Sequence, residues 1–573
     1  MPNRLFPLRP AAVLLALLFT LPSAAQSVQP AAAADPSTAT ATLAATLDSL
    51  FAAVYPDDEP GVAVLVTKGD RVLLRKGYGL ANVEHGVPIE PDMVFRLGSI
   101  TKQFTAAAVL ALAADGKLSV DDPISKFLPD YPGPGAAVTL HQLLNHTGGI
   151  PSYTSLPGFW DTAGHDLTHE EMLAFWTELP LDFEPGTDWS YSNSGYYLLG
   201  MVIEEVSGMG YEEFLHQRFF EPLGLEHTSY DDPRAIVPGR VAGYEGAPGA
   251  YRNATYLSMT QPYSAGALTS SVDDLATWSH ALLFTEKVLP AEWRERMTTP
   301  GALADGRRIA YAYGIGEGDY AGHRFIAHGG GINGFATYAL TVPEEELFVA
   351  VLANNTGRPP GPTQLANQAA ALVLGEPLDE RPQVELDEAE LAEYVGLYDI
   401  EHDDERDRLV HLENGKLFIQ RTGGSKGEIG FSEKDRFFVV GTMVEGRFER
   451  GAAGDVVGFW LEPQAGAEEM AAKTDRPLPQ RVEIEIEDPA VLDALVGRYE
   501  LAPGFVLEVS REGDELFAQA TGQPRFQLFA ESETRWFLKV VDAVVEFVGA
   551  EDGEADSVVL YQGGAEVPGK RVE

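Results

Sequence analysis

A serine and a lysine in this sequence have a spacing that suits acyl transfer. In Ser99-Ile100-Thr101-Lys102 they stand three residues apart, so on a helix both side chains share one face. The helix is expected to begin near Ser99, where free N–H groups and the helix dipole favour negative charge. A serine hydroxyl becomes a strong nucleophile only when a neighbouring group takes its proton. Taken alone, however, the pair is more typical of an N-cap serine followed by a solvated lysine.

A tyrosine and an asparagine form the second candidate element. Tyr191 and Asn193 lie in a loop segment, residues 184–193, just before a predicted helix. Both side chains can therefore point into one cleft. A phenol acts as a general base or acid if a nearby ammonium lowers its pKa, and Asn193 can orient Lys102 or a substrate amide. The alternatives are a buried tyrosine with a satisfied hydroxyl and an asparagine that caps the following helix.

The third element is His328 followed by three glycines, Gly329, Gly330 and Gly331, at the end of a strand-like run. Glycines allow a ligand to lie against the backbone of an edge strand. Their free N–H groups, those of Gly330 and Gly331 above all, predict an oxyanion hole. The alternative is a glycine turn beside a surface histidine.

The elements that must position these residues come from both ends of one region. Strand-like runs at 61–66 and 72–77 precede the helical pattern 100–114, and further strand-like runs follow at 324–327, 336–342 and 347–353. Helices are expected at 43–54 and 364–374. This order predicts one sheet built from both ends of the region, with a helical insertion between them.

The remaining sequence contains an internal repeat. The segment from Leu391 to Tyr398 matches the segment from Leu492 to Tyr499. A period of about a hundred residues is too long for a solenoid, so the repeat predicts two separate β-domains with almost no helix. Linkers are expected at 375–385 and 464–479.

Composition excludes several classes of function. The 573 residues predict several domains. The 86 acidic against 41 basic residues, a net charge of −45, exclude nucleic acid as a partner, because phosphate binding needs a basic surface. The absence of cysteine excludes disulfides and thiolate metal sites. We expect no metal and no organic cofactor, a small-molecule or peptide substrate as partner, and an oligomeric state that the sequence leaves open.

The N-terminus has the pattern of an export signal. Arg4 and Arg9 precede an apolar run at 11–21, and Ser23-Ala24-Ala25 offers small residues for cleavage. We therefore expect a signal peptide at 1–25 and a periplasmic or secreted bacterial protein with no membrane insertion after cleavage. The alternative, a membrane anchor, would need about 20 apolar residues.

Together these elements resemble the penicillin-recognising serine hydrolases, in the branch of class C β-lactamases, carboxylesterases, D-alanyl-D-alanine carboxypeptidases and D-aminopeptidases. Segments 143–151, 220–225 and 264–271 are similar to further motifs of that family. The resemblance implies an α/β hydrolase-type domain of the β-lactamase/transpeptidase-like fold, an antiparallel sheet flanked by helices with a helical insertion, at 36–376. Two small all-β, lipocalin-like barrels are expected to follow at 386–470 and 486–573.

The resemblance also assigns roles. It implies that Ser99 is acylated, that Lys102 and Tyr191 exchange protons with it, and that Asn193 is the second-motif asparagine. The backbone N–H groups of Ser99 and Gly331 would form the oxyanion hole. Whether Lys102 or Tyr191 is the acylation base stays open.

One position departs from many family members, because His328 stands where β-lactamases and carboxypeptidases often have a lysine. A neutral imidazole is a poor anchor for a substrate carboxylate. We therefore expect an exported serine hydrolase. The preferred activity is that of a peptidase of the D-aminopeptidase/carboxypeptidase-related kind, acting on a peptide with a D-residue or a free N-terminus. A small-ester carboxylesterase and a β-lactamase are alternatives. So is a non-catalytic ligand-binding scaffold.

Overall fold

A computed structural model describes residues 36–572 apart from 401–406, 423–425, 463–465, 467, 479–482, 487, 503–504, 542, 550–552 and 563–564. The predicted signal peptide, 1–25, lies outside the described residues. By its contacts the chain divides into two units, 1–42 and 43–573, and of the first unit only the start of helix α1 is described. Within the described ranges, no helix is long and apolar enough to cross a membrane.

A six-stranded antiparallel sheet forms the centre of the hydrolase-type domain. Its strand order is β10-β11-β12-β13-β1-β2, so the first strands of the region lie beside the last, as the sequence predicts. The strands are β1 (Val62–Lys68), β2 (Arg71–Tyr78), β10 (Gly316–Tyr320), β11 (His323–Ile332), β12 (Phe335–Val342) and β13 (Leu347–Ala353).

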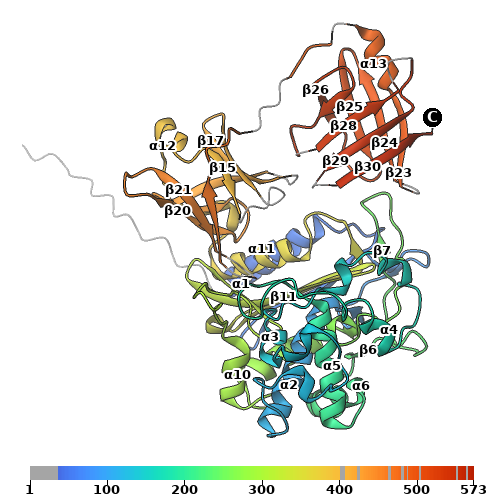
Figure 1. Cartoon of the computed structure of the whole chain (residues 1–573), viewed down its shortest axis with the longest axis vertical. Coiled ribbons are helices and arrows are strands. Elements are labelled where there is room, and N and C mark those ends of the chain that lie inside the picture. Colours follow the sequence, from blue (N-terminus) through green and yellow to red (C-terminus); the bar gives the residue numbers. More distant parts are fainter. Residues whose placement is uncertain are drawn as a thin grey trace, which may run out of the picture. The chain divides into compact units, whose positions relative to one another are not determined.

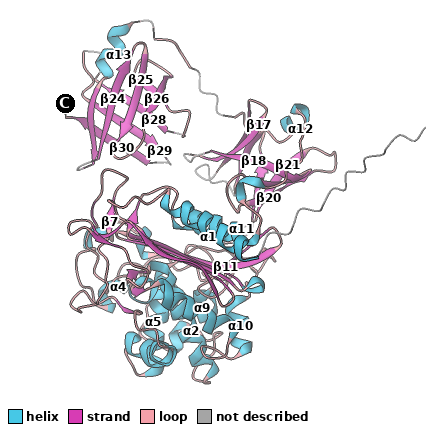
Figure 2. Cartoon of the chain, turned by 180° about the vertical axis from the view of Figure 1, so that it is seen from behind, coloured by secondary structure: helices cyan, strands magenta, loops and turns pink. Residues whose placement is uncertain are grey.

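Strand β1 shows why this sheet is covered on both faces. Its side chains alternate between two hydrophobic cores: Val62, Val64 and Val66 pack in one, and Ala63 and Leu65 in the other. Successive strand residues point to opposite faces, so a run of buried residues on both faces needs helices on each side. Helices α1 (Pro36–Ala52) and α11 (Pro362–Leu374) cover the first face, and the helical region covers the second (Figures 1 and 2).

The helical region on the second face holds most of the larger core. Its longer helices are α2 (Thr101–Ala114), α5 (Asn193–Ser207), α9 (Val272–Phe284) and α10 (Ala291–Thr298). Shorter ones are α3 (Leu140–Leu144), α4 (His169–Leu173), α6 (Tyr211–Leu215), α7 (Glu221–Leu223) and α8 (Tyr263–Gly266). Short strands complete it: β3 (Leu80–Asn82), β4 (Val87–Pro88), β5 (Phe95–Arg96), β6 (Ser229–Tyr230), β7 (Tyr244–Glu245), β8 (Arg252–Asn253), β9 (Leu268–Ser270) and β14 (Asn355–Thr356).

The C-terminal repeat forms two closed eight-stranded antiparallel barrels. The first consists of β15 (Gly396–Asp399), β16 (Arg408–Glu413), β17 (Lys416–Arg421), β18 (Lys426–Glu433), β19 (Arg436–Val439), β20 (Glu445–Arg450), β21 (Val456–Leu461) and β22 (Glu469–Lys473). The second consists of β23 (Gly497–Ala502), β24 (Phe505–Glu512), β25 (Glu515–Ala520), β26 (Phe526–Ala530), β27 (Arg535–Phe537), β28 (Ala543–Val548), β29 (Ser557–Gln562) and β30 (Ala565–Arg571).

Two details of the barrels correct the sequence prediction. A short helix precedes each barrel, α12 (Glu388–Ala392) and α13 (Pro489–Leu495), where almost no helix was expected. The reason is visible in the repeat itself: the Tyr398 hydroxyl donates to the Tyr394 carbonyl at 2.6 Å, and Tyr499 donates to Leu495 at 2.9 Å, so each tyrosine satisfies a carbonyl at a helix end. The stretch 464–479 is also no simple linker, because β22 lies within it and closes the first barrel.

Candidate active site

Ser99 lies in a 3-10 turn, Gly98–Ile100, that leads directly into α2. The turn requires glycine at position 98, where φ is 56°. It also approaches strand β11 closely: a Cβ on Gly98 would lie 2.9 Å from the backbone nitrogen of Gly331. The turn therefore brings the serine to the end of the central sheet, and Lys102 follows in the first turn of α2, as the three-residue spacing predicts.

Lys102 is fully buried and has only uncharged partners. Its Nζ donates to Asn193 Oδ1 and to the Ala265 carbonyl, both at 2.8 Å, and lies 3.2 Å from Ser99 Oγ. Among the residues that the structure describes, no carboxylate forms an ion pair with it. Burial lowers the pKa of Lys102 well below its ordinary range because a charged amine is poorly solvated there. The side chain is thus prepared to exist as a neutral amine next to the serine.

Tyr191 lies over Lys102, with the lysine Nζ 4.8 Å from the centre of its ring. Burial raises the pKa of Tyr191, and a hydrogen bond with Ser99 opposes that shift only in part. Solvent exclusion dominates, so Tyr191 is a protonated phenol at neutral pH and is suited to donate a proton.

Asn193 joins the lysine to the wall of the cleft. Its Oδ1 accepts from Lys102, and its Nδ2 donates to Thr154 Oγ1 at 3.1 Å. The alternative role, capping the helix, belongs to Ser192, whose Oγ accepts from the Gly195 N–H at 3.2 Å. Because Ser192 satisfies the first turn of α5, both ends of the Asn193 amide are available for the site.

His328 is buried on β11, and both of its ring nitrogens are engaged within the protein. Nδ1 lies 2.6 Å from the Gly329 carbonyl, which can only accept, so Nδ1 carries the proton. Nε2 is then an acceptor and receives the Tyr311 hydroxyl at 2.8 Å. Burial, together with the charge of Lys102, lowers the pKa of His328 to about 4. The imidazole is therefore neutral at pH 7 and presents no cation to a substrate.

The two glycines of the predicted oxyanion hole lie in different surroundings. A side chain at Gly330 would overlap the Leu97 carbonyl oxygen, so Gly330 permits close packing of β11 against the turn before Ser99. Gly331 is exposed and lines the same cavity as Ser99. Its backbone nitrogen lies beside Gly98.

Two buried residues of the site were not predicted from the sequence. Tyr311 donates its hydroxyl to Nε2 of His328. His146 is also buried: its Nδ1 accepts from the Ser192 N–H at 3.1 Å, and its ring centre lies 4.3 Å from that of Tyr191. The similarity of segment 143–151 to a family motif was a signal for His146. For Tyr311 no signal existed, since its only distinction is the residue it contacts.

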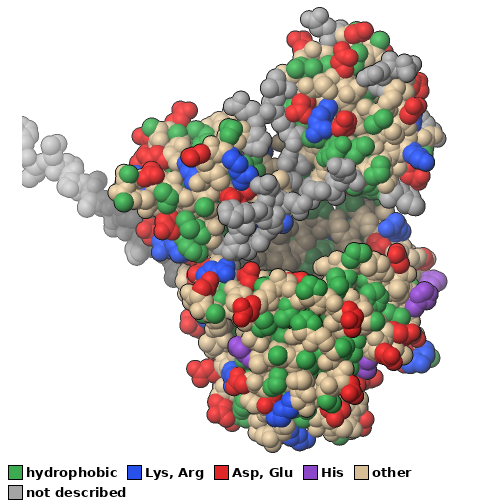
Figure 3. All heavy atoms as spheres, viewed as in Figure 1, with side chains coloured by type: hydrophobic (Ala, Val, Ile, Leu, Met, Phe, Trp, Pro, Cys, Tyr) green, Lys and Arg blue, Asp and Glu red, His purple; other side chains and the backbone are tan. Residues whose placement is uncertain are grey.

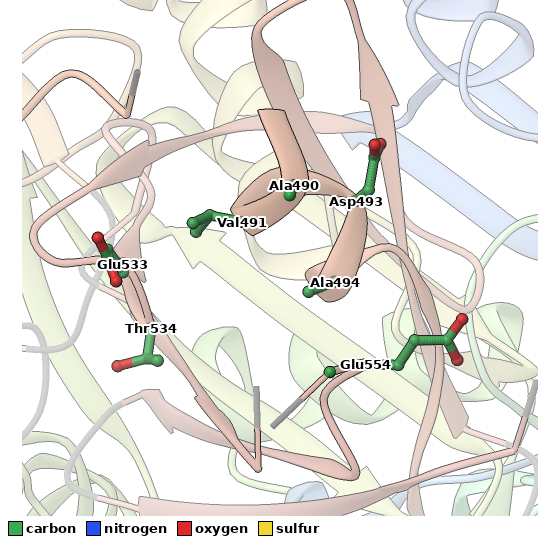
Figure 4. A pocket seen from close by; sticks show the side chains of 8 residues that line it. Ala490, Val491, Asp493, Ala494, Glu533, Thr534 and Glu554 are labelled. Carbon is green, nitrogen blue, oxygen red and sulfur yellow. The ribbon is translucent and has the colours of Figure 1, made fainter. Parts of the chain in front are cut away.

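A cavity of about 440 Å³, open mouth included, adjoins the nucleophile. Ser99, Asn193 and Gly331 contribute to its wall, so three of the predicted site residues meet there. Another cavity lies in the second barrel, beside α13. Figure 4 shows Asp493, Glu533 and Glu554 spread around that cavity instead of converging on one point, and none of the predicted site residues lines it.

Comparison with known proteins agrees with this geometry. The sequence model of the family described as Beta-lactamase matches residues 47–374. The chain belongs to the beta-lactamase family. A second model, Domain of unknown function (DUF3471), matches residues 483–570, which contain the second barrel. The family of serine hydrolases confirms the hydrolase prediction and accounts for the fold that the motifs implied.

Individual relatives match the chain well beyond the length of the hydrolase-type domain. The chain is 27% identical over 450 residues to "Penicillin-binding protein 4*" of Bacillus subtilis (strain 168), which covers 75% of this chain and 98% of the relative. It is 29% identical over 437 residues to "D-aminopeptidase" of Gluconobacter oxydans (strain 621H), covering 74% and 75%. Among solved structures, the octameric penicillin-binding protein homologue from Pyrococcus abyssi aligns with a TM-score of 0.51 and 26% identity, over 75% of this chain and 99% of that one.

The described residues contain no cluster of three or more His, Asp or Glu side chains that could hold a metal ion. Acidic side chains are instead scattered over the face shown in Figure 3 and do not gather at one place.

Proposed function

We propose that this protein hydrolyses an amide or ester through an acyl-enzyme on Ser99. The observation that carries the proposal is the buried lysine, whose Nζ lies 3.2 Å from the serine hydroxyl and which has no counter-charge among the described residues. A lysine kept neutral by burial is a general base at neutral pH. A structural lysine would instead be exposed or paired with a carboxylate.

The acylation step follows from the positions of three groups. Neutral Lys102 takes the proton of Ser99 Oγ as that oxygen attacks the substrate carbonyl carbon. The carbonyl π electrons move to oxygen, and the backbone N–H groups of Ser99 and Gly331 stabilise the oxyanion. When the carbonyl re-forms, the bond to the leaving nitrogen or oxygen breaks and Tyr191 donates its proton to that atom. The Lys102 ammonium then returns a proton to the Tyr191 phenolate.

Deacylation repeats these steps with water as the nucleophile. Lys102, neutral again, accepts a proton as a water oxygen attacks the acyl carbon. The second tetrahedral intermediate releases Ser99 Oγ, which regains its proton from the Lys102 ammonium. The free acid leaves, and the enzyme returns to its starting protonation state. No other co-reactant is required.

Within this reaction class, we propose a peptidase related to D-aminopeptidases. The similarity to a D-aminopeptidase supports this choice. The neutral state of His328 argues against substrates that need a cation for their carboxylate, which weakens the β-lactamase and carboxypeptidase alternatives. Export to the periplasm or medium, expected from residues 1–25, and a homo-oligomer, suggested by the octameric homologue from Pyrococcus abyssi, belong to the same proposal.

The test compares hydrolysis of D-alanine p-nitroanilide and p-nitrophenyl butyrate, with Ser99→Ala as the blank. Faster serine-dependent cleavage of the anilide supports the aminopeptidase. Cleavage of the ester alone favours a carboxylesterase, and turnover of a cephalosporin favours a β-lactamase. If Ser99→Ala retains full activity, the acyl-enzyme mechanism is wrong. If the natural protein fails to react with a fluorophosphonate, a non-catalytic scaffold becomes the better explanation.

A further inference from the structure

The cavity beside Ser99 is lined largely by aromatic and aliphatic side chains. Aromatic side chains form one wall: Tyr153 and Phe159 have ring centres 4.7 Å apart, and Phe159 and Trp160 have ring centres 5.1 Å apart. Leu257, Pro262 and Ile332 line the cavity as well. Leu257 belongs to a small apolar core, and Ile332 packs against that core. The space that opens from the nucleophile is therefore bounded by rings and aliphatic groups.

Several polar groups of this wall are already used within the protein. The Trp160 indole N–H donates to the Thr154 carbonyl at 3.0 Å, and the Asn333 amide donates to the Thr255 carbonyl at 2.9 Å. Asn193 is held at both ends, by Lys102 and by Thr154. Among the described lining residues, none has a charged side chain. A charged group entering the cavity would thus lose its water without gaining a partner.

We infer that the cavity beside Ser99 selects substrates whose acyl group ends in an uncharged aromatic ring. The inference rests on the proposed acyl-enzyme, since the acyl group is the part of the substrate that becomes bonded to Ser99 Oγ. A ring suits the cavity because Tyr153, Phe159 and Trp160 offer edges and faces at which aromatic pairs gain stability beyond simple burial. A carboxylate or ammonium on the ring itself opposes binding.

Trp160 is the wall residue best suited to a test. It is 53% exposed, so its substitution should leave the fold intact, whereas Tyr153 and Phe159 are almost completely buried. Phe284, at the end of α9, is an aromatic residue of similar exposure, 40%, and does not line the cavity. Phe284→Ala is therefore a matched control for the loss of an exposed ring.

The experiment measures kcat/KM of the full chain for three p-nitrophenyl esters. They carry 3-phenylpropionyl, propionyl and 3-(4-carboxyphenyl)propionyl groups, so the ring and its charge vary while the leaving group stays constant. We expect the phenyl ester to be preferred about tenfold or more over each of the others, as is usual when a hydrophobic pocket discriminates between substrates. A preference for the propionyl or carboxyphenyl ester would overturn the inference.

The variants show whether the cavity causes the preference. Trp160→Ala should lower the phenyl-to-propionyl ratio several-fold, while Phe284→Ala should leave the ratio as in the natural protein. Trp160→Arg places a cation at the aromatic wall and should raise the carboxyphenyl-to-phenyl ratio. If Trp160→Ala keeps the phenyl-to-propionyl ratio of the natural protein and Trp160→Arg keeps its carboxyphenyl-to-phenyl ratio, the ring binds elsewhere and the inference is wrong.

The blank separates this inference from the proposed function. If Ser99→Ala hydrolyses the esters as fast as the natural protein, the acyl-enzyme itself is refuted. If hydrolysis depends on Ser99 but ignores the ring, only the acyl-group inference fails.

Discussion

Two tyrosine-containing clusters, one at Ser99 and one in the first barrel, differ in the partners of their basic side chain. In the barrel, Arg450 Nε donates to both carboxylate oxygens of Asp435 at 2.9 Å, and Arg450 also contacts the Tyr394 hydroxyl. At Ser99, the basic residue Lys102 meets only neutral oxygen atoms. The barrel cluster is an ion pair that stabilises the charged forms. The Ser99 cluster is arranged so that the charged form is disfavoured.

The consequences for protonation are opposite as well. Burial raises the pKa of Asp435, but its hydrogen bonds to Arg450 and Tyr394 outweigh this, and the net pKa lies below the ordinary value of 3.8. Desolvation without a carboxylate partner lowers the pKa of Lys102. Removing one member of a paired charge lowers stability. A buried basic group without a counter-charge has a lowered pKa and can exchange protons more readily. Substitutions in and around the two clusters should break this contrast to different extents.

The largest effect is expected for Lys102→Met. Loss of the general base should lower kcat/KM about a thousandfold, while the unfolding free energy should not fall, because a buried amine is replaced by an apolar group of similar length. Steady-state kinetics and urea unfolding measure the two quantities. Lys102→Arg is the informative control, since a guanidinium stays charged and should not restore activity. Retention of more than a tenth of the natural activity would contradict the assigned role.

Tyr191→Phe should have the next largest effect, about a hundredfold on amide cleavage, because the leaving nitrogen must receive a proton. A p-nitrophenolate leaves without protonation, so the loss on a p-nitrophenyl ester should be markedly smaller. The ratio of the two losses is the measurement. Equal losses on both substrates would show that Tyr191 does not protonate the leaving group.

His328 predicts a pH-dependent stability. Its pKa is about 4 in the folded protein and 6.5 ordinarily, so between these values the unfolded chain binds a proton that the folded chain does not. Stability should therefore fall as the pH drops from 6.5 towards 4, by about 3 kcal/mol from this residue. Urea unfolding from pH 7 to pH 4 should show a shallower fall for His328→Gln. Exposed His85 offers the control: His85→Gln should follow the natural protein, and an identical slope for His328→Gln would refute the assignment.

The smallest effect is expected in the barrel. Arg450→Met removes hydrogen bonds to a charged group and should lower the unfolding free energy by about 1–3 kcal/mol, with kcat/KM unchanged. Lys416, whose side chain is 60% exposed and pairs with Glu428 at 2.7 Å, provides a surface comparison, and Lys416→Met should cost less than about 1 kcal/mol. If Arg450→Met lowers kcat/KM under conditions in which the variant is fully folded, the contrast between the two clusters does not hold.

The sequence predicted much of the fold and of the candidate site. The spacing of Ser99 and Lys102 predicted that the two side chains face one another across the start of a helix, and Ser99 lies in the turn that leads into α2, which contains Lys102. The strand patterns at both ends of the region predicted the sheet in which β1 pairs with β13. The repeat around Tyr398 and Tyr499 predicted two β-domains, but not their short helices or the strand β22 within the expected linker.

What the sequence by itself predicted is therefore the hydrolase class and the candidate residues around Ser99, from the order of the motifs and their resemblance to a known family. The tertiary structure decided the protonation states. Asn193 and Ala265 approach Lys102 from segments far along the chain, Tyr311 contacts Nε2 of His328, and the surrounding core removes water from all of them. A pKa depends on solvent exclusion and on partners brought together by folding, and no local pattern contains that information.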